Sequence, residues 1–440
     1  MVAVEAEIFA ERRRQLLESM GPGVVLLPAA PTFIRNNDVE HEYRQNSDLY
    51  YLTGFEEPES VLVLSNQHPT QRAVMFMRER DPDRETWDGP RLGVDRAVAA
   101  LGVDAAFPIR ELESRLPDYL ENHKRVHYRL GLDRAFDERF LRALDVVRVR
   151  ARRGIECPSE IVDPGVNLHE MRLRKSAPEI AIMRKASAIT RDAHIAAMRV
   201  ALPGRHEYEV EAELMRVFRA GGSERSAYGS IVGSGPNATI LHYRKNDRRL
   251  EPGDLLLIDA GAEYGLYASD VTRTFPVSGT FTPAQREIYQ LVLDSQLAAI
   301  EAVKPGSTVE AVHDVAVSVL VDGMLALGLL KGSKAEVLEN GSFRRFYMHR
   351  TSHWLGMDVH DVGRYHRAGA PRPLEPGFVL TIEPGLYIAD NAQNADVDPR
   401  YRGIGVRIED DILVTEAGRD NLTHDIPKSV EELEQLLQDR

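Results

Sequence analysis

Residues 250–261 read Leu-Glu-Pro-Gly-Asp-Leu-Leu-Leu-Ile-Asp-Ala-Gly, and residues 374–385 read Leu-Glu-Pro-Gly-Phe-Val-Leu-Thr-Ile-Glu-Pro-Gly. Seven of the 12 positions are identical, and the two segments lie 124 residues apart. In each segment a Pro-Gly turn is followed by an apolar run that is typical of a buried strand. The similarity predicts that the second part of the chain is built from two related halves.

The helices expected before these segments repeat as well. In the first half, the capping box Ser176-Ala-Pro-Glu179 begins a helix to about Val200, and a second helix covers about 206–220. In the second half, Thr282-Pro-Ala-Gln285 begins a helix to about 303, and Ser307-Thr-Val-Glu310 begins the next. A Pro-Gly pair separates the helices of each half. We therefore expect one α+β domain over residues 171–440, with halves related by a pseudo-twofold axis.

The first part of the chain has a different pattern. After a helix expected over 5–20, short apolar runs at 24–28, 60–64, 73–77 and 126–130 alternate with helical segments such as 109–121 and 135–146. This alternation predicts an α/β domain with a mixed sheet. Two prolines and a glycine between Cys157 and Asn167 mark its end, and we place the division at 170/171. The fold class is therefore α/β with two domains.

The composition narrows the class of protein. The chain has 440 residues and a net charge of −13, which argues against nucleic-acid binding because a basic face is expected there. Its single cysteine and the lack of a basic and apolar leader favour a cytoplasmic protein. The most apolar stretch, Val309–Leu330, holds four charged or ionisable residues, so we expect a buried helix there and no contact with a membrane.

Four acidic side chains are expected to meet at the centre of the repeated domain. Asp259 and Glu383 occupy the same position of the repeat, each at the end of an apolar strand. Each half supplies another acid on a following strand, Asp270 in the first half and Glu409 in the second. If each pair of strands forms a hairpin, the four carboxylates converge. Buried charges of this kind need a partner or a metal ion.

Two divalent cations would balance four carboxylates. Arg273 and Arg407 are the main local alternatives. Oxygen-rich sites with one imidazole favour ions such as Mn²⁺, Mg²⁺, Co²⁺ or Zn²⁺. His349, His353 and His360 lie within 12 residues upstream of the Glu383 strand, and their spacing leaves open which of them is the ligand.

Five stretches resemble the metal-ligand motifs of the pita-bread metallopeptidases. They are Asp259-Ala-Gly, Asp270-Val-Thr-Arg-Thr-Phe, His353-Trp-Leu-Gly-Met-Asp-Val-His-Asp, Thr381-Ile-Glu-Pro-Gly and Gly405-Val-Arg-Ile-Glu-Asp, in the order of the family. Further stretches are similar to the amino-terminal domain of the bacterial aminopeptidase P group. They are Tyr43-Arg-Gln-Asn-Ser-Asp-Leu-Tyr-Tyr-Leu-Thr-Gly-Phe-Glu-Glu-Pro, residues 87–93 and His169-Glu-Met-Arg-Leu. The resemblance therefore covers nearly the whole chain.

The resemblance implies a reaction and its metal ligands. The reaction is hydrolysis of the bond between an N-terminal residue and a following proline, by a hydroxide bridging two metal ions, most often Mn²⁺, with Co²⁺ or Zn²⁺ as alternatives. The implied ligands are Asp259, Asp270, His353, Glu383 and Glu409, with Asp270 and Glu409 as bridges. Glu383 is in addition the implied general base.

The resemblance also implies the groups that hold the substrate. His242 and His360 would polarise the scissile carbonyl or hold the peptide, and Arg407 and Tyr387 would support the site. The residues implied to line the pocket or bind the substrate are His349, Tyr387, Tyr228, Asp38 and Trp87. In tetrameric relatives the Asp38 position comes from a neighbouring subunit, so a homo-oligomer, dimer or tetramer, is expected. The resemblance further implies that an arginine of the N-terminal region contacts the substrate, and Arg152 and Arg153 are both candidates.

One position departs from the pattern, and three other functions compete. Many relatives have glycine directly after the first histidine of the cluster, where this chain has Arg350, so the pocket wall near His349 is expected to differ. The first alternative is a prolidase, which cuts dipeptides only. A methionine aminopeptidase is disfavoured by the long N-terminal domain. The intact metal motifs count against a metal-free creatinase or a binding protein without catalysis.

Overall fold

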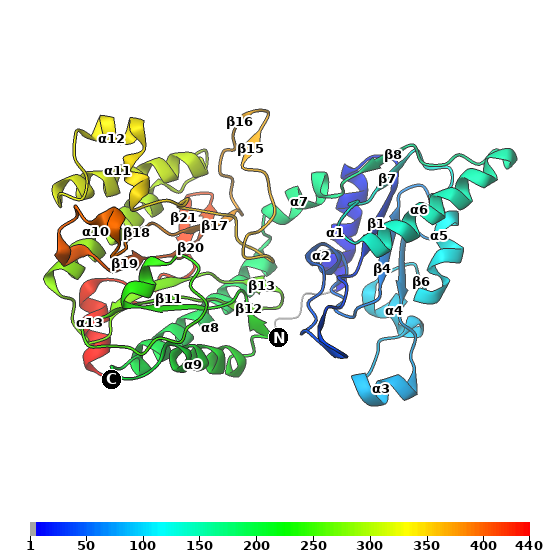
Figure 1. Cartoon of the computed structure of the whole chain (residues 1–440). Helices are drawn as coiled ribbons and strands as arrows, with labels where there is room; N and C mark the ends of the chain where they lie inside the picture. Colours follow the sequence, from blue (N-terminus) through cyan, green and yellow to red (C-terminus); the bar gives the residue numbers. More distant parts are fainter. Residues whose placement is uncertain (1–5) are drawn as a thin grey trace. The chain divides into compact units, whose positions relative to one another are not determined.

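The computed structural model describes residues 6–440. The chain folds into two compact units, one ending at Arg172 and the other spanning Leu173–Arg440 (Figure 1). No helix within the described residues is long and apolar enough to cross a membrane. The apolar stretch that begins at Val309 forms helix α11 (Val309–Ala326), as the charged residues within it predict.

The N-terminal unit is built on a six-stranded mixed sheet, which confirms the expected α/β class. The strand order is β6-β5-β4-β1-β7-β8, with β1 antiparallel to β4 and parallel to β7. The sheet consists of β1 (Val24–Pro28), β4 (Val61–Ser65), β5 (Ala73–Met77), β6 (Ala105–Pro108), β7 (Arg125–His127) and β8 (Glu160–Val162). A separate hairpin is formed by β2 (Ile34–Asn36) and β3 (Val39–Glu40).

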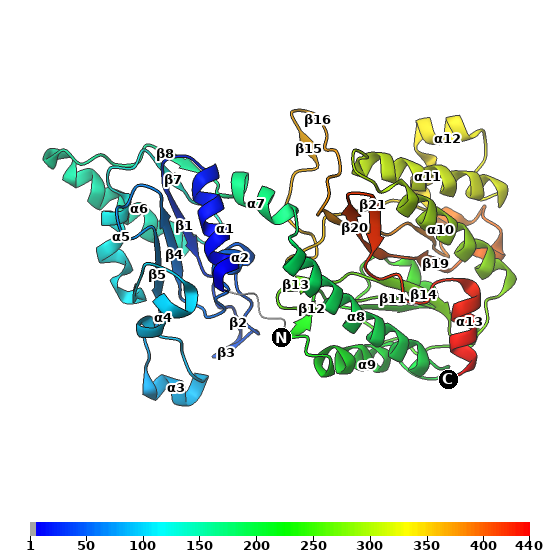
Figure 2. The ribbon, with the colours of Figure 1, turned by 180° about the vertical axis from the view of Figure 1, so that it is seen from behind.

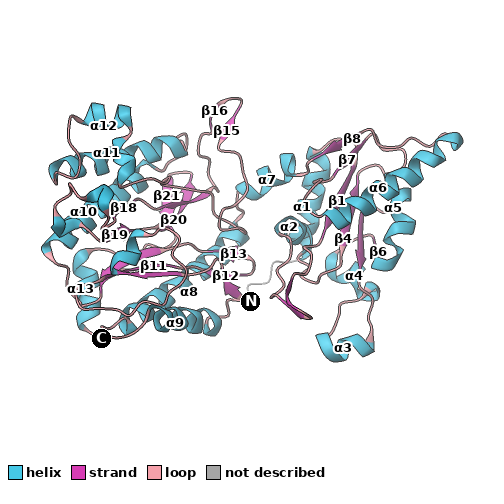
Figure 3. Ribbon diagram, in the orientation of Figure 1, coloured by secondary structure: helices cyan, strands magenta, loops and turns pink. Residues whose placement is uncertain are grey.

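Helices lie on both sides of this sheet (Figure 3). The helices up to the end of this unit are α1 (Ala6–Ser19), α2 (Ser47–Thr53), α3 (Pro82–Asp88), α4 (Val94–Leu101), α5 (Leu112–Leu120), α6 (Arg134–Val149) and α7 (Gly165–Leu173). Leu116 of α5 and Phe140 of α6 pack against Val63 and Phe76 of the central strands. Because these strands are buried on both faces, they read as continuous apolar runs in the sequence.

Two predicted elements of this unit differ from the structure. The strand expected over 126–130 covers only Arg125–His127, and Leu130 is 53% exposed beside the turn at Gly131. The apolar run therefore extends past the end of the sheet. The helix expected over 109–121 begins with a 3-10 turn at Ile109–Glu111 before α5.

The C-terminal unit contains two similar halves, which confirms the expected repeat and the pita-bread fold. The first half holds helices α8 (Ala177–Val200) and α9 (Glu207–Ala220), and the second holds α10 (Pro283–Ala302), α11 and α12 (Lys334–Asn340). The pairs α8–α9 and α10–α11 flank the strands of their halves (Figures 1 and 2). Helix α13 (Val430–Gln438) closes the chain and contacts α8.

The strands of the two halves are connected in the same way. In the first half β11 (Leu255–Asp259) pairs antiparallel with β14 (Thr272–Pro276), and in the second β17 (Val379–Ile382) pairs antiparallel with β20 (Asp410–Thr415). The other strands are β9 (Arg225–Ser226), β10 (Ile231–Ser234), β12 (Ala262–Tyr264), β13 (Tyr267–Ala268), β15 (His366–Arg367), β16 (Ala370–Pro371), β18 (Gly385–Ile388), β19 (Ile404–Arg407) and β21 (Gly418–Asn421).

The two halves meet where β14 approaches the turn before β20. The backbone N–H of Glu409 donates to the carbonyl of Thr272 at 3.1 Å. The Thr274 hydroxyl donates to the carbonyl of Arg407 at 3.0 Å. These contacts bring the ends of the four repeated strands together at one side of the unit.

Candidate metal centre

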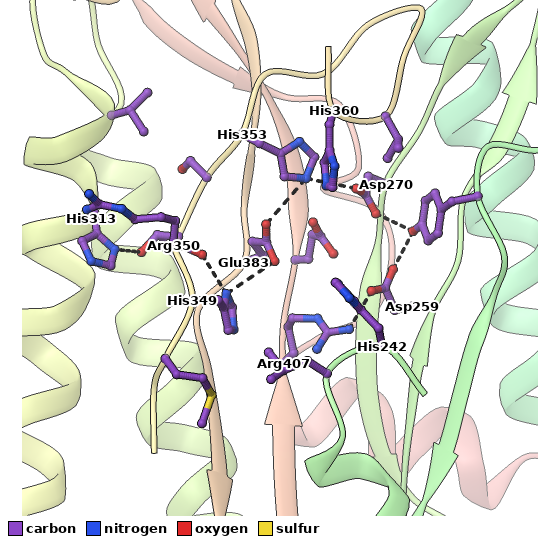
Figure 4. A pocket seen from close by; sticks show the side chains of 18 of the residues that line it. His242, Asp259, Asp270, His313, His349, Arg350, His353, His360, Glu383 and Arg407 are labelled. Carbon is purple, nitrogen blue, oxygen red and sulfur yellow. Dashed lines mark hydrogen bonds and ion pairs between the residues drawn. The ribbon is translucent and has the colours of Figure 1, made fainter. Parts of the chain in front are cut away.

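The C-terminal unit encloses a cavity of about 980 Å³, lined by residues of both halves (Figure 4). Its polar lining contains the four acids expected from the sequence and the three histidines of the cluster. These residues are Asp259, Asp270, Glu383, Glu409, His349, His353 and His360. His242, Tyr228 and Arg407 also line the cavity.

The strand ends explain how the four carboxylates reach the cavity. Asp259 is the last residue of β11, and Glu383 directly follows β17, as the repeat predicts. Glu409 directly precedes β20, and Asp270 lies two residues before β14. The second acid of each half therefore lies just outside the following strand, where its backbone is free to turn toward the cavity.

Three of the candidate ligands form a compact group. Asp270, His353 and Glu409 can place one ligand atom each within 4.8 Å of one another. His353 Nδ1 donates to the carbonyl of Trp354 at 3.0 Å, so Nε2 is left to face the carboxylates. His353 Nε2 lies 3.4 Å from Asp270 Oδ2 and 3.6 Å from Glu383 Oε1. Among the three clustered histidines, His353 is thus the one whose geometry fits a metal ion.

Asp259 is connected to this group through Tyr228, and it has a second partner in Arg407. Its Oδ1 lies 2.6 Å from the Tyr228 hydroxyl, which also contacts Asp270. A phenol has one proton and can donate it to only one of these carboxylates at a time. Arg407 Nη2 donates to Asp259 Oδ2 at 2.6 Å. The oxygen-rich donor set with one imidazole fits hard or borderline divalent cations.

The pKa shifts show how much negative charge is crowded here. Burial raises the pKa of Glu409 well above its usual range, and Asp270 and Glu383 add to the effect. Burial likewise raises the pKa of Glu383 to about 7, although His353 and Arg407 oppose it. Burial alone would lower the pKa of His353, but Asp270 and Glu383 raise it to about 9. Divalent cations would relieve this crowding.

Arg407 begins a directional chain of hydrogen bonds away from the acids. Its Nη1 donates to the Tyr387 hydroxyl at 3.0 Å, and that hydroxyl lies 2.8 Å from His349 Nε2. Burial, with the charge of Arg407, lowers the pKa of His349 to about 3, so the ring is neutral. His349 Nδ1 can then donate to the carbonyl of Arg350 at 2.7 Å. Tyr387 itself is not among the lining residues, and its hydroxyl is connected to the cavity through His349 and Arg407.

Arg273 does not face the carboxylate cluster. The sequence offered Arg273 as an alternative source of positive charge for the four acids, but its guanidinium is fully buried against Asp410 at 2.7 Å. Of these two arginines, Arg407 bonds the carboxylate of one of the four acids, whereas Arg273 reaches only the backbone carbonyl of Glu409. The interpretation that Arg273 could replace a cation is therefore wrong.

Several supporting residues were not identified from the sequence. The Thr272 hydroxyl donates to Glu409 Oε2 at 2.6 Å and accepts from Arg407 Nε at 3.1 Å. Asp411 accepts from the backbone N–H of Asp270 at 3.1 Å. Two consecutive acids in the buried strand β20 were a usable signal, because such charges need partners. The apolar lining residues Ile231, Leu241, Val309, Met348 and Val359 come from distant segments and carry no common motif.

The remaining candidates lie in the N-terminal unit. Asp38 occupies the turn of the exposed hairpin β2–β3, where Asn37 has a φ of 45°. Trp87, near the end of α3, is 86% exposed. Arg152 and Arg153 lie in the 3-10 turn Arg150–Arg153, and both are exposed. These side chains are available to other molecules.

The fold and the cavity together define a pita-bread hydrolase that depends on metal ions. The model of metallopeptidase family M24 matches residues 181–416, and that of the aminopeptidase P N-terminal domain matches residues 9–128. The chain belongs to metallopeptidase family M24, in its aminopeptidase P group.

Relatives match the chain over almost its full length. It is 46% identical to the Xaa-Pro aminopeptidase of Escherichia coli strain K12 over 439 residues, covering 99% of each chain. It is 43% identical to that of Haemophilus influenzae, covering 99% of this chain and 98% of the relative. Among solved structures, Pseudomonas aeruginosa aminopeptidase PepP shares 48% identity with a TM-score of 0.98, covering 100% and 99% of the two chains.

Proposed function

We propose that this enzyme hydrolyses the peptide bond between an N-terminal residue and a following proline, and so releases the first residue of a peptide. The observation that carries the proposal is the convergence of Asp270, His353 and Glu409 beside Asp259 and Glu383 in one cavity. The relatives with full-length similarity bear the name Xaa-Pro aminopeptidase, which favours this reaction over that of a prolidase.

Asp259, Asp270, His353, Glu383 and Glu409 would hold two divalent ions, most often Mn²⁺, with Co²⁺ or Zn²⁺ as alternatives. Asp270 and Glu409 are proposed to bridge the two ions. Such ions, when bound, polarise a carbonyl and lower the pKa of a water molecule. A histidine that binds a metal ion is neutral, so the four carboxylates and Arg407 would together carry a charge of −3. One divalent ion would leave a negative charge, which supports a second ion.

Glu383 is the proposed carrier of the proton. It lies between His353 and His349, with its Oε2 3.8 Å from His349 Nδ1. A carboxylate held in the cavity can accept a proton from water and return it to a leaving group. We propose that Glu383 accepts the proton of the attacking water and delivers it to the leaving proline nitrogen.

The substrate is proposed to be held by neutral donors and apolar walls. Burial lowers the pKa of His360, so its neutral ring can donate an N–H to a developing oxyanion. His242, which also lines the cavity, is proposed to share this role. A proline nitrogen in a peptide has no hydrogen to donate, so the ring must be recognised by shape. Tyr228, His349 and the apolar lining residues are proposed to supply that shape.

Residues 1–170 are proposed to control access of the substrate and to make contacts between subunits. The exposed positions of Trp87 and Asp38 support a role in contacting a peptide or a neighbouring copy. We propose a dimer or tetramer in the cytoplasm in which these residues complete the site. The mass of the oligomer in solution, and the activity of Trp87→Ala, test this part.

A series of substrate lengths tests the proposed reaction. Metal-free enzyme is loaded with Mn²⁺, Co²⁺ or Zn²⁺ and given Xaa-Pro, Xaa-Pro-Xaa and longer peptides. Release of the first residue from the longer peptides is expected, and activity confined to dipeptides would instead identify a prolidase. Asp259→Ala is the control for the metal ions. Unchanged hydrolysis by that variant would contradict the proposed use of the carboxylates.

A further inference from the structure

Arg350 is a cation without a partner in the wall of the cavity. Its side chain is exposed and lines the cavity, and its guanidinium forms no hydrogen bond or ion pair with any described residue. An arginine side chain stays charged at every working pH and offers five N–H donors. Arg407, another arginine of the lining, is bonded to Asp259, Tyr387 and Thr272. Arg350 is therefore available to a ligand in a way that Arg407 is not.

The backbone of Arg350 is held in place independently of its side chain. Its carbonyl accepts from His349 Nδ1 at 2.7 Å, at the end of the hydrogen-bond chain that starts at Arg407. Within residues 6–440, the non-glycine residues with a positive φ do not include Arg350. Its backbone therefore takes an ordinary conformation, and an arginine fits here without backbone strain. A change of its side chain should leave that hydrogen-bond chain intact.

The lining groups near Arg350 form no ion pair with it. His313 lies beside it (Figure 4), and its pKa is lowered to about 4 by burial and by the charge of Arg350, so the ring is neutral. The one acid of the described lining outside the carboxylate cluster is Glu310, which lies 3.4 Å from His366 Nε2. Met348, 46% exposed, supplies an apolar neighbour in the chain. A ligand with a carboxylate would find a free positive charge at this end of the cavity.

The position of Arg350 also indicates which part of a peptide it meets. Glu383 and His349 lie between Arg350 and the side of the cavity that holds Asp259 and Asp270 (Figure 4). In the proposed function, Glu383 protonates the leaving nitrogen, so the leaving peptide begins beside Glu383. Continuing past His349, that peptide runs toward Arg350 and the exposed side of the cavity.

We propose that Arg350 binds a carboxylate of the leaving peptide and makes the enzyme prefer substrates that carry a carboxylate shortly after the proline. This inference rests on the proposed function and adds a substrate class to it. The carboxylate can be the C-terminal group of a short peptide or an acidic side chain at the same distance. Arginine forms two parallel bonds with a carboxylate, which gives the contact direction as well as strength.

Pairs of substrates that differ in one charge test the proposal. The first pair is Xaa-Pro-Ala with a free carboxylate and with a C-terminal amide, and the second is Xaa-Pro-Glu amide and Xaa-Pro-Gln amide. The ratio of kcat/KM within each pair is measured for Mn²⁺-loaded wild type, Arg350→Gln, Arg350→Lys and Arg244→Gln. Arg244 is the matched control because it is another exposed arginine of the same lining without a bonded partner among the described residues.

For wild type we expect a preference of about fivefold to tenfold for the charged member of at least one pair, falling as salt is added. Arg350→Gln should bring the ratio close to one, Arg350→Lys should keep part of it, and Arg244→Gln should keep it all. The first pair reports a C-terminal carboxylate, and the second reports an acidic side chain. Metal content and melting temperature confirm that each variant is folded.

Two results would overturn the assignment of Arg350: wild-type ratios near one in both pairs, or a preference that survives in Arg350→Gln. Loss of the preference in Arg244→Gln alone would assign the contact to Arg244 and would also overturn it. Failure of the proposed function is distinguishable, because wild type would then release no first residue from any of the four peptides.

Discussion

The buried guanidinium of Arg273 is expected to be one of the largest single contributors to the stability of the C-terminal unit. It makes five hydrogen bonds, which matches the number of its N–H donors. They go to Asp410 Oδ1 at 2.7 Å and to the carbonyls of Thr272, Glu409, Ile426 and Pro427 at 2.9, 2.6, 3.1 and 3.1 Å. Arg273 therefore joins β14 to the turn before β20 and to the segment before α13.

The change Arg273→Met keeps a long apolar stem and removes every one of these bonds. Asp410 would keep Lys428 and Gln296 as partners, but it would lose its fully buried cation. Removing one partner of a buried ion pair costs about 3–5 kcal/mol. Lys428 would still balance part of the charge of Asp410, but four carbonyls would lose their donor as well. For a unit of this size each kcal/mol corresponds to about 2–4 °C, so the melting temperature should fall by about 6–20 °C.

Differential scanning calorimetry of the metal-loaded protein measures this shift. The control is Arg286→Met, because Arg286 is 46% exposed and its contact with Glu434 at 2.7 Å is worth no more than about 1 kcal/mol. Bound metal ion should also decrease in Arg273→Met, since Glu409 loses the bond that holds its carbonyl. A melting temperature for Arg273→Met no lower than that of the control would refute the reasoning about buried compensation.

Three further outcomes are expected. In metal-free enzyme the pKa of Glu383 is raised from 4.5 to about 7, so Glu383 holds its proton more tightly in the folded state. The free energy of unfolding should therefore fall by up to about 3 kcal/mol as pH rises from 4.5 to 7. A melting temperature that does not change across this range would contradict the prediction. Tyr387→Phe breaks the bond to His349 and should lower kcat/KM by about tenfold to a hundredfold in steady-state assays; an unchanged value would show that the hydrogen-bond chain is dispensable. Thr272→Val removes the hydroxyl bonded to Glu409 and should weaken metal binding by about tenfold to a hundredfold in a chelator titration; unaltered affinity argues against this role.

Much of the fold could be predicted because its signals are local. The Pro-Gly turns, capping boxes and apolar runs of the repeat each depend on fewer than about a dozen neighbouring residues. The same repeat predicted that Asp259 and Glu383 lie at strand ends. The pairing of each of these strands with the next then places the second acid of each half, Asp270 or Glu409, near the first. The end of β7 could not be predicted, because Leu130 is apolar yet exposed, and only the extent of the sheet decides this.

The supporting contacts could not be predicted because they join distant segments. Arg407 and Asp259 are 148 residues apart, and Arg273 and Pro427 are 154 residues apart. Neither pair leaves a periodic or compositional signal. In both His353 and His349 the Nδ1 atom faces the carbonyl of the next residue. The choice between them depends on what Nε2 faces, which is Asp270 for His353 and the Tyr387 hydroxyl for His349, and only the folded structure decides this.

The two halves differ where the chemistry requires it. Asp259 pairs with Thr272 across its strands, and extending the register Ile382–Asp410 by one residue brings Glu383 to Glu409. The first-half counterpart of Glu409 is therefore Thr272, which supports Glu409 by a hydrogen bond instead of adding a fifth acid. Asp270, the second acid of the first half, lies two residues before Thr272 in the chain. Gly261 permits this, because a Cβ there would lie 1.7 Å from the carbonyl oxygen of Ser269. The identical glycine of the repeat thus allows the backbone before Asp270 to approach closely. Because threonine takes the place of one acid, the cluster in the cavity has four carboxylates.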